Sequence, residues 1–186
     1  DGKNNQSKSF RRIVFDELFA NFLTLSENRK RIRINKFPKK FTNKNSDLIK
    51  KKLSFTLTND QEKVLDEINQ DLLSDKRMFR IIQGDVGSGK TIVSLLSILN
   101  VIKSGYQCAL MSPTEILAKQ HYQLIKKIFD NENFDIEFLT GKTEYKLRKI
   151  ILTNLKSGKI KLLIGTHALF QKKINFQKLG LVVIDE

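Results

Sequence analysis

A glycine-rich segment near the middle of the chain holds the residues best suited to chemistry. It reads Gly84-Asp85-Val86-Gly87-Ser88-Gly89-Lys90-Thr91 and follows the pattern G-x-x-x-x-G-K-[ST]. Glycines allow backbone N–H groups to approach phosphate oxygens, and a helix that begins directly after them presents its positive end to the same anion. We expect Lys90 to contact the β- and γ-phosphates and the Thr91 hydroxyl to bind Mg²⁺. The segment therefore predicts a phosphate-binding loop.

Two carboxylates follow an apolar run at the other end of the chain. Asp185 and Glu186 come directly after residues 181–184, which read Leu-Val-Val-Ile. An acidic pair after a strand is by itself a common turn. In the same sheet as a phosphate-binding loop, however, Asp185 is expected to hold Mg²⁺ and Glu186 to polarise an attacking water. The pair favours hydrolysis of the γ-phosphate by water over its transfer to a substrate hydroxyl.

An aromatic ring and an amide lie upstream of the loop. The Gln61 amide can pair with the N6 and N7 edge of adenine, and the Phe55 ring can stack on the base. Taken alone, the same residues also fit a buried Phe and a helix-capping Gln, because Thr58 and Gln61 have the spacing of a capping box. The position shortly before a phosphate-binding loop favours adenine recognition.

Three polar loops follow later apolar runs: Ser112-Pro113-Thr114-Glu115, Thr140-Gly141-Lys142 and Gly165-Thr166-His167. Each places a helix N-terminus or a small polar residue where a nucleic-acid phosphate fits. Each also fits an ordinary loop between a strand and a helix. His167 alone is typical of a hydrogen-bonded loop residue, His121 of a helix surface, and Cys108 of a buried strand.

These residues need a framework that brings them to one place. After residue 58 the hydrophobic pattern alternates between helices and short apolar strands, which predicts an α/β fold with a parallel sheet flanked by helices. Ligands bind such sheets at the C-terminal ends of the strands. The expected strands cover residues 78–82, 107–111, 135–139, 161–164 and 181–184, and the expected helices cover residues 58–73, 90–103, 114–129 and 143–156.

The first 55 residues differ from the rest in pattern and charge. An apolar stripe at helical spacing predicts a helix over residues 10–33, and residues 35–54 have the composition of a linker. The net charge is +14, and this segment contributes +10 of it, from 15 Lys+Arg against 5 Asp+Glu. Arg29, Lys30, Arg31 and Arg33 with Lys50, Lys51 and Lys52 form either a surface for nucleic-acid phosphates or a solvated linker.

Composition excludes several classes of protein. No apolar run is long enough for a membrane span, and the single cysteine excludes a disulfide scaffold and favours a reducing, cytosolic setting. The polar start at Asp1 lacks the apolar core of a signal peptide. A start without Met and an end directly after an apolar run lead us to expect a fragment of a longer protein.

Taken in order, these motifs resemble the Q-motif and motifs I, Ia, Ib-type and II of superfamily 2 helicases. The segment from Gln83 to Thr91 is most similar to that of the RecG family of bacterial DNA helicases, and residues 15–21 resemble the helix that joins wedge and motor domains in that family. The resemblance implies an ATP-dependent helicase that unwinds branched DNA, such as stalled forks and Holliday junctions, in recombination and repair. It implies a basic helical linker over residues 1–55 and a RecA-like P-loop NTPase domain over residues 56–186, the first of two motor domains. It further implies a monomer in the bacterial cytoplasm at the nucleoid, with no membrane partner.

The resemblance also assigns roles to individual residues. Lys90 and Glu186 would be catalytic, and Thr91 and Asp185 would bind Mg²⁺. ATP would be bound by Phe55, Gln61, Gly84, Asp85, Val86, Gly87, Ser88, Gly89, Lys90 and Thr91. DNA would be contacted by Pro113, Thr114, Glu115, Gly141, Lys142, Gly165, Thr166 and His167. The sequence departs from the family pattern at Ser54, where the family has Pro, and it stops before the His expected two residues after Glu186.

Two alternatives remain open at this point. The transcription-repair coupling translocase shares much of this motor, although it usually has Tyr at the position of Ser88. For the chain taken alone, the alternative is a nucleotide-binding module without turnover, because hydrolysis in this family needs residues from both motor domains.

Overall fold

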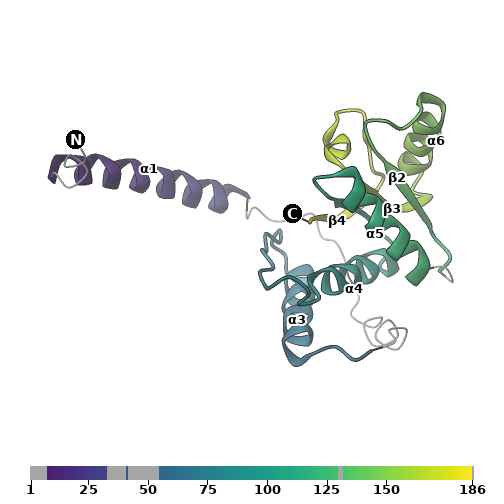
Figure 1. Cartoon of the computed structure of the whole chain (residues 1–186), viewed down its shortest axis with the longest axis horizontal. Coiled ribbons are helices and arrows are strands. Elements are labelled where there is room, and N and C mark those ends of the chain that lie inside the picture. The colour runs from purple at the N-terminus through teal and green to yellow at the C-terminus, as the bar shows by residue number, and fades with distance from the viewer. Residues whose placement is uncertain (1–7, 33–40, 42–54, 130–131, 186) are drawn as a thin grey trace. The chain divides into compact units, whose positions relative to one another are not determined.

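The computed structural model describes residues 8–32, 41, 55–129 and 132–185 (Figure 1). These residues belong to two compact units. One unit contains helix α1 (Lys8–Ile32) together with residues 74–79, and the other contains residue 41 with residues 55–73 and 80–185. We describe each unit by itself.

Helix α1 confirms the helix expected over residues 10–33. Its apolar side chains are exposed along the helix, including Ile13 at 65% and Phe22 at 68% of their accessible area. The rings of Phe15 and Phe19 stack with 5.8 Å between their centroids, as neighbours one turn apart can. The helix therefore forms as the spacing predicts, and its apolar side chains are exposed.

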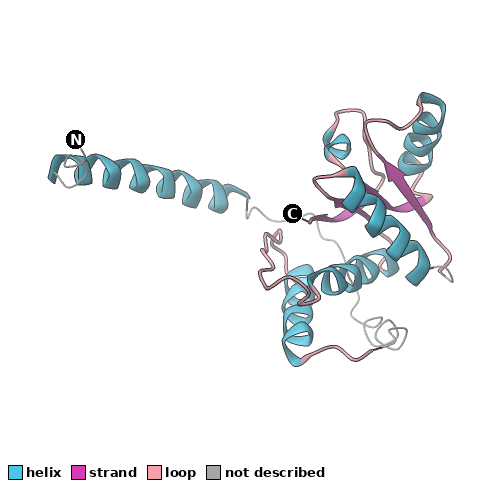
Figure 2. Cartoon of the chain, in the orientation of Figure 1, coloured by secondary structure: helices cyan, strands magenta, loops and turns pink. Residues whose placement is uncertain are grey.

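The second unit is built on a parallel sheet of four strands (Figure 2). The strands are β1 (Gln107–Met111), β2 (Asp135–Leu139), β3 (Ile160–Gly165) and β4 (Leu179–Ile184), in the spatial order β2-β3-β1-β4. Helix α4 (Lys90–Lys103) packs against β1 and β4, α5 (Glu115–Ile128) against β2 and β3, and α6 (Tyr145–Lys156) against β3. This confirms the α/β fold with a parallel sheet flanked by helices.

The central strands form the core of this unit. Leu162, Leu163 and Ile164 of β3 are fully buried, which is typical of a parallel strand covered on both faces. Gln107 of β1 is also buried, and its side chain is satisfied: Nε2 donates to the carbonyls of Leu155 at 2.9 Å and Ile160 at 2.6 Å, while Oε1 accepts from the Lys178 N–H at 2.9 Å. These bonds join β1 to the segments that flank β3 and β4.

Helix α3 (Asn59–Leu73) precedes the strands in the chain and packs against α4. Leu65, Ile68 and Leu72 are buried on one face, as the helical spacing predicts. In the same contact the Asn100 amide donates to the buried Asn69 side chain at 2.9 Å. The two helices that come before and after the glycine-rich loop are thus joined by buried apolar side chains and one buried hydrogen bond.

Some expected elements differ from the structure. Residues 78–82 form a loop, with Phe79 and Ile81 exposed at 74% and 88%, and none of the described strands pairs with them. A strand forms only where a neighbour satisfies its N–H and C=O groups, so an apolar run alone does not make one. Helix α6 begins at Tyr145 instead of residue 143, because the Thr143 hydroxyl accepts from the Thr140 N–H at 2.9 Å and closes a turn there. The short 3₁₀-helix η3 (His167–Phe170) has no counterpart in the sequence expectations.

Residue 41 falls in the expected linker, yet Phe41 is buried in the second unit. Its ring centroid lies 5.0 Å from that of Tyr106.

Among the described residues, no helix combines the length and the apolar character that crossing a membrane requires.

Candidate nucleotide and nucleic-acid site

The glycine-rich segment forms a loop that runs into α4. Gly87 and Gly89 have φ values of +83° and +85°, a region that side chains with a Cβ rarely adopt. A Cβ at Gly89 would lie 2.3 Å from Nε2 of Gln61. Gly89 is also the N-cap of α4, so the N-cap has no side chain to occupy the first N–H groups of the helix. The loop therefore presents a helix N-terminus without a side-chain cap, which suits an anion.

Lys90 lies across this loop. Its ammonium donates hydrogen bonds to the carbonyls of Gly84 and Asp85, both at 2.7 Å. The positive charge is thereby held within the loop in which the phosphates are expected. A phosphate oxygen would compete for the ammonium with these two neutral carbonyls, and a charged acceptor forms the stronger bond.

Gln61 connects the start of α3 with the loop. The Thr58 N–H donates to Oε1 of Gln61 at 3.0 Å and the Gln61 N–H donates to the Thr58 hydroxyl at 3.3 Å, which confirms the capping box. Nε2 of Gln61 donates to the Ser88 carbonyl at 2.9 Å. Both ends of the amide thus have partners within the chain, whereas the Phe55 ring is 48% exposed.

The polar loops meet at one edge of the sheet. In the strand register, Leu139 of β2 lies beside Gly165 of β3, Gly165 beside Met111 of β1, and Met111 beside Ile184 of β4. The C-terminal ends of all four strands are therefore aligned along one edge of the sheet. The Ser112 N–H donates to the Gly165 carbonyl at 3.0 Å and the Asp185 N–H donates to the Met111 carbonyl at 2.9 Å. Glu186 lies outside the described residues.

Two of the three loops are joined by an ion pair between Lys142 and Glu115, at 2.9 Å. The Thr114 hydroxyl caps α5 by accepting from the Leu117 N–H at 3.3 Å, and Pro113 is exposed. A Cβ at Gly141 would meet no atom within 4 Å, so this backbone is open.

Gly165 differs from the other expected DNA contacts. It is buried, and a Cβ there would lie 2.0 Å from the carbonyl oxygen of Leu139 on β2. The absence of a side chain is thus required for β2 and β3 to approach each other. Thr166 and His167 follow at the start of η3, with His167 exposed.

His121 does not lie on the exposed helix surface that the sequence suggested. Its side chain is 13% exposed, and its Nε2 lies 2.7 Å from Oδ2 of Asp185. The helical spacing contained the signal, because His121 follows buried Ala118 by three residues and precedes buried Ile125 by four. The carboxylate expected to hold Mg²⁺ is therefore positioned by α5.

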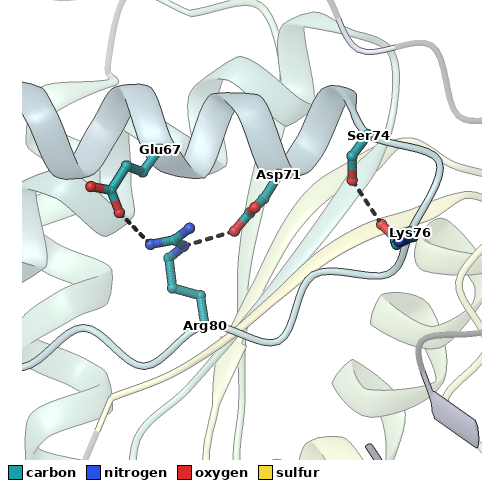
Figure 3. Close-up of polar contacts among 5 residues, drawn as sticks. All are labelled: Glu67, Asp71, Ser74, Lys76 and Arg80. Atoms are coloured by element: carbon teal, nitrogen blue, oxygen red, sulfur yellow. Dashed lines mark hydrogen bonds and ion pairs between the residues drawn. The ribbon is translucent and has the colours of Figure 1, made fainter. Parts of the chain in front are cut away.

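Arg80 was not singled out from the sequence, although it supports the segment that enters the loop (Figure 3). Its Nε donates to Asp71 at 2.7 Å and its Nη1 to Glu67 at 2.6 Å, both on α3. The hydrogen bond to Asp71 raises the pKa of the Arg80 guanidinium above its ordinary value, and the hydrogen bond to Glu67 contributes less in the same direction. Partial burial opposes this rise without cancelling it. The Ser74 hydroxyl donates to the Lys76 carbonyl at 3.3 Å, and the same figure draws this contact.

The described residues contain no group of three side chains that could enclose a metal ion. Mg²⁺ does not require one, because it is usually held by one or two protein oxygens together with substrate phosphates and water. The hydroxyl of Thr91 and the carboxylate of Asp185 are hard oxygen donors of the kind that this ion prefers. The expected donor set is chemically suited to Mg²⁺ bound with a nucleotide.

Comparisons with known proteins agree with these features. The sequence model of the DEAD/DEAH box helicase family matches residues 58–186. The chain is 44% identical over 179 residues to the ATP-dependent DNA helicase RecG of Aquifex aeolicus, covering 95% of this chain and 22% of that protein. It is 46% identical over 182 residues to RecG of Synechocystis, covering 95% of this chain and 21% of that protein.

A solved structure of RecG bound to a three-way DNA junction superimposes with a TM-score of 0.85 at 42% identity, covering 95% of this chain and 24% of that one. The chain thus spans between a fifth and a quarter of the length of these relatives. The resemblance to superfamily 2 helicases and to RecG is confirmed. Because the family model matches residues 58–186 and the parallel sheet is RecA-like, the chain belongs to the DEAD/DEAH box helicase family.

Proposed function

We propose that the whole protein is an ATP-dependent DNA helicase that unwinds branched DNA, including stalled forks and Holliday junctions, in recombination and repair. The observation that carries this proposal is the convergence of the three polar loops after β1, β2 and β3 with Asp185 on one edge of the sheet. The RecG relatives and the junction-bound RecG structure support the substrate class. We also propose a monomer that acts on nucleoid DNA in the bacterial cytoplasm.

ATP binds at the loop formed by residues 84–91. Lys90 exchanges its two carbonyl acceptors for the β- and γ-phosphates, and the N–H groups at the start of α4 contact the same anion. Phe55 stacks on adenine, and Gln61 pairs with its edge while it adjusts its bond to Ser88. The side chain that recognises the base thereby also contacts the loop that holds the phosphates.

Thr91 and Asp185 hold Mg²⁺, which neutralises charge on the β- and γ-phosphates when it is bound. Glu186 accepts a proton from the attacking water. The loops containing Pro113, Thr114, Glu115, Gly141, Lys142, Thr166 and His167 contact the DNA backbone. Gly165 contributes by allowing the strands beneath them to approach closely. The domains are a helical linker over residues 1–55 and the first motor domain over residues 56–186.

The chain taken alone binds nucleotide with little turnover. The family resemblance supports this proposal, because it implies that hydrolysis needs residues from a second motor domain, whereas the loop could bind ATP by itself.

The decisive experiment measures ATP hydrolysis by the full-length protein with and without DNA. We expect forked DNA to stimulate turnover several-fold more than linear duplex of the same length and composition. Equal turnover with and without forked DNA would contradict the proposed function. Robust DNA-dependent hydrolysis by the 186-residue chain alone would contradict the proposed need for a second domain.

Replacing His121 tests whether α5 positions Asp185. We expect His121→Ala to raise the Mg²⁺ concentration needed for tight binding of a fluorescent ATP analogue by about tenfold, because partners of metal ligands typically contribute that much to metal affinity. Binding is followed by fluorescence at increasing Mg²⁺, without turnover. Gln120→Ala, at an exposed position on the same helix, is the matched control. An unchanged Mg²⁺ dependence in His121→Ala would exclude the positioning role.

A further inference from the structure

Helix α6 and the segment around η3 enclose an open groove of about 840 Å³ that lies outside the loops assigned above. Its lining contains five cations and no carboxylate. The cations are Arg148, Lys149 and Lys156 on α6 and Lys172 and Lys173 after η3. A groove lined by charges of one sign attracts an extended anion, because the field of the neighbouring cations adds up within it.

The charge pattern of the chain supports this interpretation. Between Tyr145 and Ile184 the sequence has nine Lys or Arg residues and no Asp or Glu. The preceding residues 56–144 carry 13 Asp or Glu against ten Lys or Arg. Within residues 56–184 the net positive charge is therefore confined to the part of the chain that forms this groove and the strands beside it.

Two aromatic rings lie among the groove cations. Tyr145, at the start of α6, is 79% exposed, and Phe170, at the end of η3, is 58% exposed. Rings this exposed contribute little to the core, and both belong to the groove lining. Aromatic faces next to cations form the kind of surface on which unpaired bases stack while the backbone is neutralised.

The two walls of the groove are joined. Nη2 of Arg148 on α6 donates to Oε1 of Gln171, the residue after η3, at 2.5 Å. This bond holds the lysines after η3 beside α6, so the groove does not depend on a free loop. It also leaves Lys149, Lys172 and Lys173 exposed.

The groove adjoins two of the loops at the sheet edge. α6 begins three residues after Lys142, and η3 begins at His167 directly after Thr166. Two loops expected to contact DNA therefore lead directly into the elements that form the groove.

We propose that this groove binds single-stranded DNA, with Arg148, Lys149, Lys156, Lys172 and Lys173 contacting phosphates and Tyr145 and Phe170 stacking on unpaired bases. The proposal rests on the proposed DNA helicase function and adds a site for the strand that unwinding releases. Single-stranded DNA is favoured over duplex because only unpaired bases present their faces to the two rings.

Charge reversal in the full-length protein tests the phosphate contacts. Lys172→Glu with Lys173→Glu is compared with Lys126→Glu with Lys127→Glu, a pair of exposed lysines near the end of α5 that makes the same change in net charge. Fluorescence anisotropy measures binding of a labelled oligothymidine over a series of salt concentrations. We expect the groove pair to weaken binding at least tenfold more than the α5 pair. The slope of log affinity against log salt should fall by about 0.7 for each phosphate that the variant no longer neutralises.

Ring removal tests the single-strand assignment. Tyr145→Ala and Phe170→Ala should each weaken oligothymidine binding by about tenfold, with an unchanged salt slope and unchanged binding of blunt duplex. Circular dichroism and thermal unfolding establish that the variants are folded. Equal losses for duplex and single strand would overturn the assignment to unpaired bases, and equal losses for the groove and α5 charge pairs would overturn the site.

These outcomes are separable from those of the proposed function. If forked DNA stimulates ATP hydrolysis while the groove variants bind oligothymidine like the unmodified protein, the groove proposal fails alone. If the groove variants lose single-strand affinity but forked DNA has no effect on hydrolysis, the helicase proposal fails and the binding site stands.

Discussion

Lys90→Ala is expected to reduce DNA-stimulated ATP hydrolysis of the full-length protein by about 10²-fold or more. The ammonium is the only cation within the phosphate-binding loop, and its contacts with the carbonyls of Gly84 and Asp85 hold it there before a nucleotide arrives. Its removal eliminates the point charge that opposes the β- and γ-phosphates. Steady-state phosphate release with forked DNA measures the effect.

The control for Lys90 is Lys63→Ala, which removes an exposed lysine from α3. This change should leave hydrolysis near normal. Binding of a fluorescent ATP analogue, measured alongside, should weaken in Lys90→Ala while thermal unfolding stays close to that of the unmodified protein. Near-normal turnover in Lys90→Ala would contradict the role assigned to the loop.

Gly165→Ala is expected to destabilise the pairing of β2 and β3 by about 3 kcal/mol. The new Cβ would lie 2.0 Å from the carbonyl oxygen of Leu139, which belongs to the backbone of a buried strand end and cannot rotate away. The strands must separate to accommodate it. Hydrogen exchange of the full-length protein, resolved by peptide, measures the loss as faster exchange in residues 135–139 and 160–165.

Gly141→Ala is the matched control, because a Cβ there meets no atom within 4 Å. Both glycines belong to the set expected to contact DNA, yet only Gly165 should affect strand protection. Faster exchange of similar size in both variants, or unchanged protection in Gly165→Ala, would show that close strand approach is not what requires glycine at residue 165.

Short-range patterns predicted much of the second unit. The strands at residues 107–111 and 135–139 and the helix at residues 90–103 agree with the structure at both ends. Their signals are local: an apolar run between turn residues, or an apolar face at helical spacing that ends near a glycine. The phosphate-binding loop was predicted for the same reason, since its residues are consecutive in the chain.

The expected strand at residues 78–82 shows the limit of such signals. Four of the five residues are apolar, yet strand formation depends on a partner that is distant in sequence. Gln61 is a second example of this limit. Its capping box with Thr58 spans three residues and could be predicted from the spacing, whereas its bond to the Ser88 carbonyl spans 27 residues and could not. Gly165 is a third, since its need for close approach to Leu139 follows only from strand order.

The sequence by itself predicted a phosphate-binding loop at residues 84–91, and it determined most of the alternation of helices and strands and the residue types available at each loop. The tertiary structure alone decided that His121 contacts Asp185, that Arg80 ties the loop entry to α3, and that the cations of α6 face those after η3 across one groove. The physical reason is the range of the interactions. Helical spacing and glycine conformation act over a few residues, whereas these contacts depend on how whole elements pack. His121 meets Asp185 only when the parallel sheet brings distant segments together, and Arg80 meets Asp71 and Glu67 only when the chain folds back along α3.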